Sequence, residues 1–137
     1  MSGLPKERRR SKRNQLDLPL RFRMFLPSHR DEDSTAFLPG RIYDISKHGI
    51  SLLTNTVEHR GLHIFHPNIT STEQCLLEIE IPKAEGNLVL RGRVVWYDRA
   101  SPGDPFSFRA GVEFVDQTPE LVKEVQALVR QAGQGKG

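Results

Sequence analysis

Two short segments of the sequence carry residues suited to binding a planar, anionic ligand. The first is a basic segment near the N-terminus, which holds one lysine and four arginines: Arg8, Arg9, Arg10, Lys12 and Arg13. An arginine guanidinium donates paired hydrogen bonds to phosphate oxygens and to the O6/N7 edge of guanine, whereas a lysine adds charge without that planar fork. The segment indicates a polyanionic partner, and charge alone leaves open the alternative of a solvated basic tail.

The second segment is Asp44-Ile45-Ser46-Lys47-His48-Gly49, which lies between two expected strands. In one interpretation, Asp44 and Ser46 form an Asx or Ser turn and Gly49 takes a positive φ. In the other, an exposed carboxylate and hydroxyl point at a ligand, because a carboxylate accepts hydrogen bonds from donors such as the N1–H and N2–H₂ of guanine. Gly49 would then let a ligand or another backbone segment approach closely.

The charge is unevenly distributed over the 137 residues, whose net charge is only +3. The segment 1–30 holds nine Lys and Arg against two acidic residues, a net charge of +7, so the rest of the chain has a net charge of −4. Six of the nine cations fall within residues 6–13. This distribution therefore predicts that the basic N-terminal segment is an anion-binding arm, attached to a domain with a net negative charge.

Little in the sequence favours catalysis or metal binding. The G-x-S-x-G, H-E-x-x-H and P-loop motifs are absent, and the lone Cys75 lies in a strand pattern typical of a buried thiol. His59, His63 and His66 have the spacing of helical metal ligands, but a glycine and a proline interrupt that segment. We therefore expect a binding protein with no catalytic residue, no metal and no cofactor.

The sequence also predicts a cytoplasmic protein. It has no run of about 18 apolar residues, the length that a transmembrane helix requires. The basic N-terminus is not followed by the apolar stretch of a secretory signal. A single cysteine cannot form an internal disulfide, which is typical of a reducing compartment.

From Leu16 onward, apolar residues alternate with polar ones, as in half-buried strands. The expected strands lie at residues 16–26, 41–44, 50–54, 75–81, 88–97 and 106–114, and residues 55–73 show no clear periodicity. Thr118 is an expected helix N-cap, followed by an apolar face over residues 121–129 and a stop at Gly133. Six antiparallel strands and a terminal helix predict a small β-barrel with the helix packed against it or over its mouth.

Four motifs in order resemble the PilZ domain. An Arg-x-x-x-Arg pair, Arg9 and Arg13, precedes Asp-x-Ser-x-x-Gly at Asp44, Ser46 and Gly49. The gap between the two motifs is long, and the acidic loop after the first expected strand accounts for its length.

Two later motifs extend this resemblance over residues 7–131. Gly-Arg-Val-Val-Trp at residues 92–96 and Gly-Val-Glu-Phe-Val at residues 111–115 resemble the last two strands of the family. Each motif is weak alone, but the four together on a β-barrel pattern are a specific signal.

PilZ domains are bacterial receptors for cyclic di-GMP (c-di-GMP), a dianion with two guanines. The resemblance implies a six-stranded antiparallel β-barrel with one C-terminal helix and a flexible basic N-terminal arm. The expected division is an arm at residues 1–14, the barrel and helix at residues 15–131, and a disordered tail at residues 132–137.

The resemblance also implies which residues contact the ligand. Arg9 and Arg13 grip guanine edges and phosphates, and Arg8 and Arg10 assist them. The remaining implied contacts come from the body of the domain: Asp44, Ser46, Gly49 and Trp96. For Trp96, the residues alone leave open whether the indole stacks on a guanine or packs in the core, since the alternation of its strand groups it with Leu88, Leu90 and Val94.

The implied mechanism is a switch in which a dianion neutralises the arm and pins it against the barrel, presenting a new surface to a downstream protein partner. One alternative is a β-barrel that binds nucleic acid nonspecifically through the arm, although no aromatic residues interleave with its cations. A second alternative is an adaptor with the PilZ fold that binds only protein. We expect no DNA partner.

Overall fold

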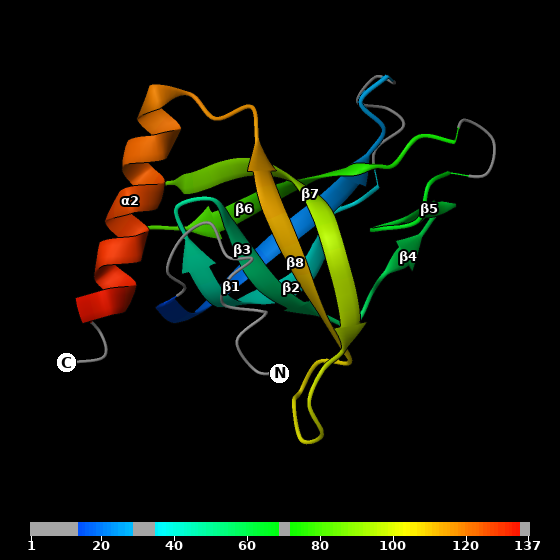
Figure 1. Cartoon of the computed structure of the whole chain (residues 1–137), viewed down its shortest axis with the longest axis horizontal. Helices are drawn as coiled ribbons and strands as arrows, with labels where there is room; N and C mark the ends of the chain where they lie inside the picture. Colours follow the sequence, from blue (N-terminus) through cyan, green and yellow to red (C-terminus); the bar gives the residue numbers. More distant parts are fainter. Residues whose placement is uncertain (1–13, 29–34, 69–71, 135–137) are drawn as a thin grey trace, which may run out of the picture.

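A computed structural model describes residues 14–28, 35–68 and 72–134 of the chain (Figure 1). The described residues form eight strands and one helix. In chain order these are β1 (Asn14–Phe25), β2 (Leu38–Ser46), β3 (Gly49–Thr54), β4 (Glu58–His59), β5 (Leu62–His63), β6 (Leu76–Pro82), β7 (Asn87–Arg99), β8 (Phe108–Val115) and α2 (Pro119–Gln134).

Six of the strands close into an antiparallel barrel in the order β1-β2-β3-β8-β7-β6. Alternate residues of each strand point into the barrel, and residues such as Phe22, Ile50, Ile79, Leu90 and Ala110 are buried there. The predicted six-stranded barrel and the predicted C-terminal helix are both confirmed.

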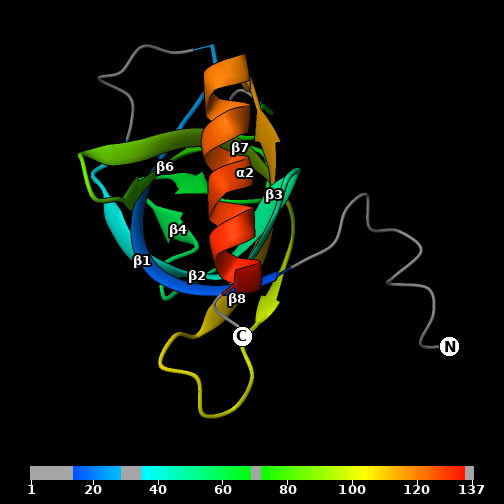
Figure 2. The same ribbon diagram turned by 90° about the vertical axis from the view of Figure 1, so that its left-hand side faces the viewer.

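Helix α2 lies across one open end of the barrel, as the view along the barrel shows (Figure 2). The hydroxyl of Thr118 accepts a hydrogen bond from the backbone N–H of Leu121 at 3.2 Å, so the expected N-cap is confirmed. Val125 and Ala132 are buried against the barrel. The helix runs to Gln134 and thus passes the expected stop at Gly133 by one residue. No helix within the described ranges is both long and apolar enough to cross a membrane.

The segment between β3 and β6 contains a structure that the sequence did not indicate. Strands β4 and β5 pair as a two-residue hairpin outside the barrel sheet, with Glu58 opposite His63. Arg60 and Gly61 at its turn both have positive φ values, 53° and 84°. Such short strands carry no periodicity that could reveal them.

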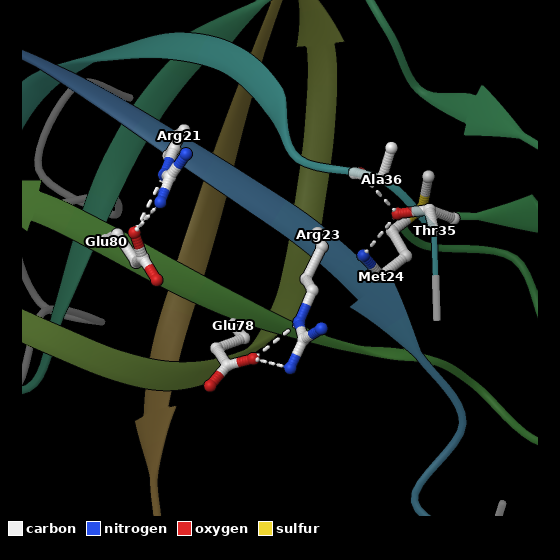
Figure 3. A network of polar contacts seen from close by, with 7 residues as sticks. All are labelled: Arg21, Arg23, Met24, Thr35, Ala36, Glu78 and Glu80. Atoms are coloured by element: carbon white, nitrogen blue, oxygen red, sulfur yellow. Dashed lines mark hydrogen bonds and ion pairs between the residues drawn. The ribbon is translucent and has the colours of Figure 1, made fainter. Parts of the chain in front are cut away.

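Strands β1 and β6 are joined on the outer surface by two ion pairs (Figure 3). The Nε–H groups of Arg21 and Arg23 donate to Glu80 and Glu78 at 2.7 and 2.6 Å, and both pairs sit directly opposite in the register. Two of the cations of the segment 1–30 are thus already paired with acidic residues of the barrel. Six of the other cations in the segment 1–30 belong to residues 6–13, which lie outside the described residues.

Candidate ligand-binding face

Five barrel strands place one residue each in a continuous cross-strand row, which we call the outer row. The register pairs are Gln15 with Asp44, Asp44 with Ser51, Ser51 with Gly111, and Gly111 with Trp96. The neighbours of these residues along β3 and β8 are core residues, so the row lies on the outside of the barrel. Two residues far apart in the sequence, Asp44 and Trp96, therefore belong to the same surface.

Asp44 lies beside a cation from β8. Its Oδ2 is 3.6 Å from Nη2 of Arg109, and Asp44 is only 7% exposed. The interpretation in which the carboxylate of Asp44 is exposed is therefore wrong, since the residue is buried beside Arg109. Arg109 also stacks on the preceding residue of β2: its Cζ is 4.0 Å from the ring centroid of Tyr43.

Ser46 and Gly49 build the tight turn between β2 and β3. The hydroxyl of Ser46 accepts from the N–H of His48 at 3.3 Å and donates to the carbonyl of Gly49 at 3.4 Å, so the Ser-turn interpretation describes it. Ser46 is 2% exposed, and its expected exposure is also wrong for this reason.

The expected positive φ of Gly49 is wrong as well, since the positive-φ glycines within the described residues are Gly61, Gly86 and Gly103. A glycine is required at position 49 for another reason, which is that the neighbouring strand β8 leaves no room for a side chain. A Cβ at Gly49 would lie 2.1 Å from the carbonyl oxygen of Val112. The backbone that approaches Gly49 is therefore that of β8.

Trp96 lies on the outer surface and not in the core. A bulge between Val94 and Trp96 shifts the register of β7 against β8, so that Trp96 leaves the buried face that its strand pattern predicted. Trp96 is 39% exposed, and its indole lies over Gly111, where a Cβ would be 2.1 Å from the indole Nε1. The absence of a side chain at Gly111 makes the room for the ring, and the exposed part of the ring remains available for stacking.

A groove of about 690 Å³ adjoins the outer row. Gln15 and Tyr43 form part of its wall, together with the loop after β7 and the last turns of α2. An ion pair lies within it, in which Nε of Arg41 donates to the carboxylate of Asp17 at 2.7 Å. The surface beside Asp44 is therefore hollowed and carries both polar and apolar groups.

The predicted arm residues Arg8, Arg9, Arg10 and Arg13 lie outside the described residues. The structure does define where the described chain begins: Asn14 pairs with Ile45, and Gln15 pairs with Asp44. The residue that follows the Arg-x-x-x-Arg motif is thus next to the Asp-x-Ser-x-x-Gly motif. Two motifs that lie far apart in the sequence are connected at the same end of the β1–β2 pair.

Two of the histidines, His63 and His66, form an aromatic cluster with Phe65 and Tyr97, whereas His59 pairs with Leu62 in the β4–β5 hairpin. The ring centroids of His63 and His66 are 4.5 Å apart, and Nε2 of His66 is 3.3 Å from the hydroxyl of Tyr97. Nδ1 of His63 accepts from the backbone N–H groups of Phe65 and His66 at 2.9 and 3.1 Å. Burial, and secondarily the nearby His66, lower the pKa of His63. No group of three or more potential metal ligands is found in the described part of the chain.

Cys75 lies next to this cluster, just before β6. The residue is 2% exposed, and its Sγ donates to the carbonyl of His63 at 3.1 Å. Burial raises the pKa of the thiol to about 12. A thiol that stays protonated at neutral pH is a poor nucleophile, so Cys75 has the structural role that its strand pattern indicated.

Four residues of this surface were not predicted from the sequence: Gln15, Tyr43, Ser51 and Arg109. Tyr43 and Arg109 come together because β2 and β8 both flank β3, and their contact depends on the register of all three strands. The local alternation shows only that Arg109 lies two residues before Gly111, on the same side of β8.

The fold and these motifs define a β-barrel of the PilZ class, and the sequence agrees with the family model. The PilZ domain model matches residues 7–131, and the chain belongs to this family. A comparison with curated proteins gave no match.

Solved structures share the fold at low sequence identity. The PilZ domain with c-di-GMP of YcgR from Escherichia coli has a TM-score of 0.67 and 15% identity, over 94% of each chain. The PilZ domain of CeSA from a cellulose-synthesizing bacterium has a TM-score of 0.55 and 16% identity, over 88% of this chain and 97% of that one. The MrkH–c-di-GMP complex of K. pneumonia has a TM-score of 0.57 and 17% identity, over 95% of this chain and 56% of that one.

Proposed function

We propose that this protein is a c-di-GMP receptor, which binds the dinucleotide between its N-terminal arginine segment and the outer row. The observation that carries the proposal is that Asp44 and Trp96 both belong to the outer row. This row begins at Gln15, one residue after Asn14, the first residue of β1. This row combines an acceptor for guanine N–H groups with a stacking surface, beside the place where the arginine segment joins the barrel. The structural similarity to the PilZ domain of YcgR, whose structure holds c-di-GMP, supports the same ligand class.

Each group of residues has a distinct role in this proposal. Arg9 and Arg13 contact guanine edges and phosphates, with Arg8 and Arg10 adding charge and hydrogen bonds. Asp44 accepts from a guanine, and Trp96 stacks on a base. Ser46 and Gly49 shape the turn that holds Asp44, and Ser46 does so through the hydrogen bonds it already makes within the turn.

The reach of the arginine segment is compatible with this arrangement. Arg13 is bonded to Asn14, and Arg9 is five residues from Asn14, a span of at most roughly 17 Å in an extended chain. A c-di-GMP molecule on the outer row therefore lies within reach of both arginines of the motif.

The proposed output is binding to another protein, with no reaction of its own. Neutralising the arginine segment with a dianion brings it onto the barrel and creates a surface that the ligand-free protein lacks. Such a surface is a recognition site for a downstream protein partner. In this account the protein is a sensor in second-messenger signalling.

Calorimetric titration of the protein with c-di-GMP, GTP and a DNA oligomer tests the proposal. We expect saturable binding of c-di-GMP at about 150 mM salt and much weaker binding of GTP and DNA, since charge-driven contacts to DNA are screened at this ionic strength. Equal affinity for all three anions, with a steep salt dependence, would favour a nonspecific binder of nucleic acid. No heat with any of the three would favour an adaptor that binds only protein.

A further inference from the structure

A single guanidinium connects the carboxylate and the indole of the outer surface. The Cζ of Arg109 is 4.0 Å from the ring centroid of Tyr43 and 5.7 Å from that of Trp96, while its Nη2 is 3.6 Å from Oδ2 of Asp44. These three partners come from β2 and β7, on either side of the β3–β8 pair that carries Arg109. Arg109 therefore links the two sides of the outer row.

The position of Arg109 is set by stacking and charge more than by hydrogen bonds. Its side chain is 32% exposed, and the 3.6 Å separation from Asp44 is an ion-pair distance beyond that of a hydrogen bond. Its Nε is buried and has no hydrogen-bond partner among the described residues. The planar face that lies on Tyr43 is therefore the main restraint on where the positive charge sits.

We propose that Arg109 is a positioning residue for guanine recognition, an inference that rests on the proposed function. Its charge attracts the Asp44 carboxylate and orients it as an acceptor for guanine N–H groups. Its stacking between Tyr43 and Trp96 holds the indole over Gly111, where the ring offers its outer part to a base. Arg109 thus acts through Asp44 and Trp96, in contrast to the arm arginines, which contact the dinucleotide directly.

Selectivity for guanine is the property that this role predicts. The N1–H and N2–H₂ of guanine both donate to a carboxylate, whereas adenine presents an acceptor at N1. A correctly held Asp44 therefore favours c-di-GMP over cyclic di-AMP, which carries the same phosphates. An arginine that only attracts phosphate would raise the affinity for both dinucleotides equally.

The test compares Arg109→Met and Arg109→Lys with the wild type, using calorimetric titration with c-di-GMP and with cyclic di-AMP. Arg91→Met is the matched control, because Arg91 also stacks on an aromatic ring, with its Cζ 5.2 Å from the centroid of Phe25, but lies away from Asp44. We expect Arg109→Met to lose about tenfold or more in affinity for c-di-GMP and much less for cyclic di-AMP. Arg109→Lys keeps the charge but not the planar stack, so it restores part of the selectivity, and Arg91→Met binds as the wild type does.

Two further measurements separate positioning from general destabilisation. The emission of Trp96, the one tryptophan of the chain, should change in ligand-free Arg109→Met and not in Arg91→Met. Combining Asp44→Asn with Arg109→Met should cost less affinity than the sum of the two single effects, since both act on the contact between Asp44 and guanine. If Arg109→Met does not fold, as judged by its thermal unfolding, the selectivity of Arg109→Lys decides the question.

Three outcomes overturn the inference. If Arg109→Met loses affinity equally for both dinucleotides, Arg109 contacts the phosphates. If its affinity for c-di-GMP is unchanged, Arg109 has no role in binding. Tighter c-di-GMP binding by Arg109→Met shows that Arg109 blocks Asp44. In contrast, wild-type protein that binds no c-di-GMP overturns the proposed function itself, and that titration is made first.

Discussion

The indole of Trp96 occupies the space in which a side chain at Gly111 would begin, with Nε1 2.1 Å from the position of a Cβ. The two residues are directly opposite in the register of β7 and β8. The glycine of one strand thus decides how the aromatic residue of the other lies on the outer surface. Because the ring is partly exposed, it can move without disturbing the core.

Gly111→Ala is therefore expected to affect ligand binding more than folding. The added methyl displaces the indole, and the stack with a base, worth about 1–3 kcal/mol in other aromatic–base contacts, is weakened. We expect a reduced affinity for c-di-GMP, by up to about tenfold, and a shifted Trp96 emission, with little change in the thermal midpoint. Wild-type emission and affinity in this variant would remove Trp96 from the proposed site.

Gly49→Ala is the contrasting control. Its Cβ would lie 2.1 Å from the carbonyl oxygen of Val112, which is backbone and cannot rotate away. Strands β3 and β8 must separate locally, so we expect a loss of stability of about 1–3 kcal/mol in urea unfolding. Comparing Gly111→Ala with Gly49→Ala therefore separates an effect on ligand binding from an effect on stability.

The arm arginines should differ from the lysine between them. Arg13→Ala removes a charge-assisted, bidentate contact and should weaken c-di-GMP binding by about tenfold or more, on the order of 1.5–3 kcal/mol. Lys12→Ala removes the same charge but no planar fork, so its loss in calorimetric titration should be clearly smaller. Equal losses for the two variants would mean that the segment supplies only charge.

His63 makes stability depend on pH. Its Nδ1 accepts two backbone N–H groups, and a proton there would break both contacts. Burial lowers the pKa of His63 in the folded state. At pH values between the pKa of the folded state and that of the unfolded state, the unfolded state therefore binds more protons. The contribution of His63 to stability is therefore full above about pH 6.5 and falls as the pH drops below that value.

Urea unfolding at several pH values between about 7.5 and 5 measures this effect. We expect wild-type stability to fall more steeply with decreasing pH than that of His63→Asn, whose amide oxygen can accept an N–H but does not titrate. Parallel pH profiles for the two proteins would contradict the role of His63. The difference between the profiles isolates His63 from the other four histidines.

The sequence predicted the barrel because period-two alternation directly reflects which side of a strand is buried. It predicted the helix from Thr118 and the apolar spacing that follows. The exposure of Trp96 could not be predicted, because the bulge after Val94 depends on the pairing of β7 with β8. The contact of Arg109 with Asp44 was missed for a similar reason, since it depends on the register across β2, β3 and β8.

Asp44 supplies the most direct test of specific recognition. Replacing this carboxylate with alanine makes the surface around Arg109 more positive, so a protein that only attracts polyanions should bind c-di-GMP more tightly. If Asp44 accepts hydrogen bonds from guanine, the same change weakens binding despite the added positive charge.

The decisive measurement is calorimetric titration of wild-type and Asp44→Ala protein with c-di-GMP at about 150 mM salt, with thermal unfolding of both proteins as the check on folding. We predict saturable binding by the wild type and an affinity about tenfold lower or more for Asp44→Ala. Absence of binding by the wild type, or tighter binding by Asp44→Ala, would contradict the account.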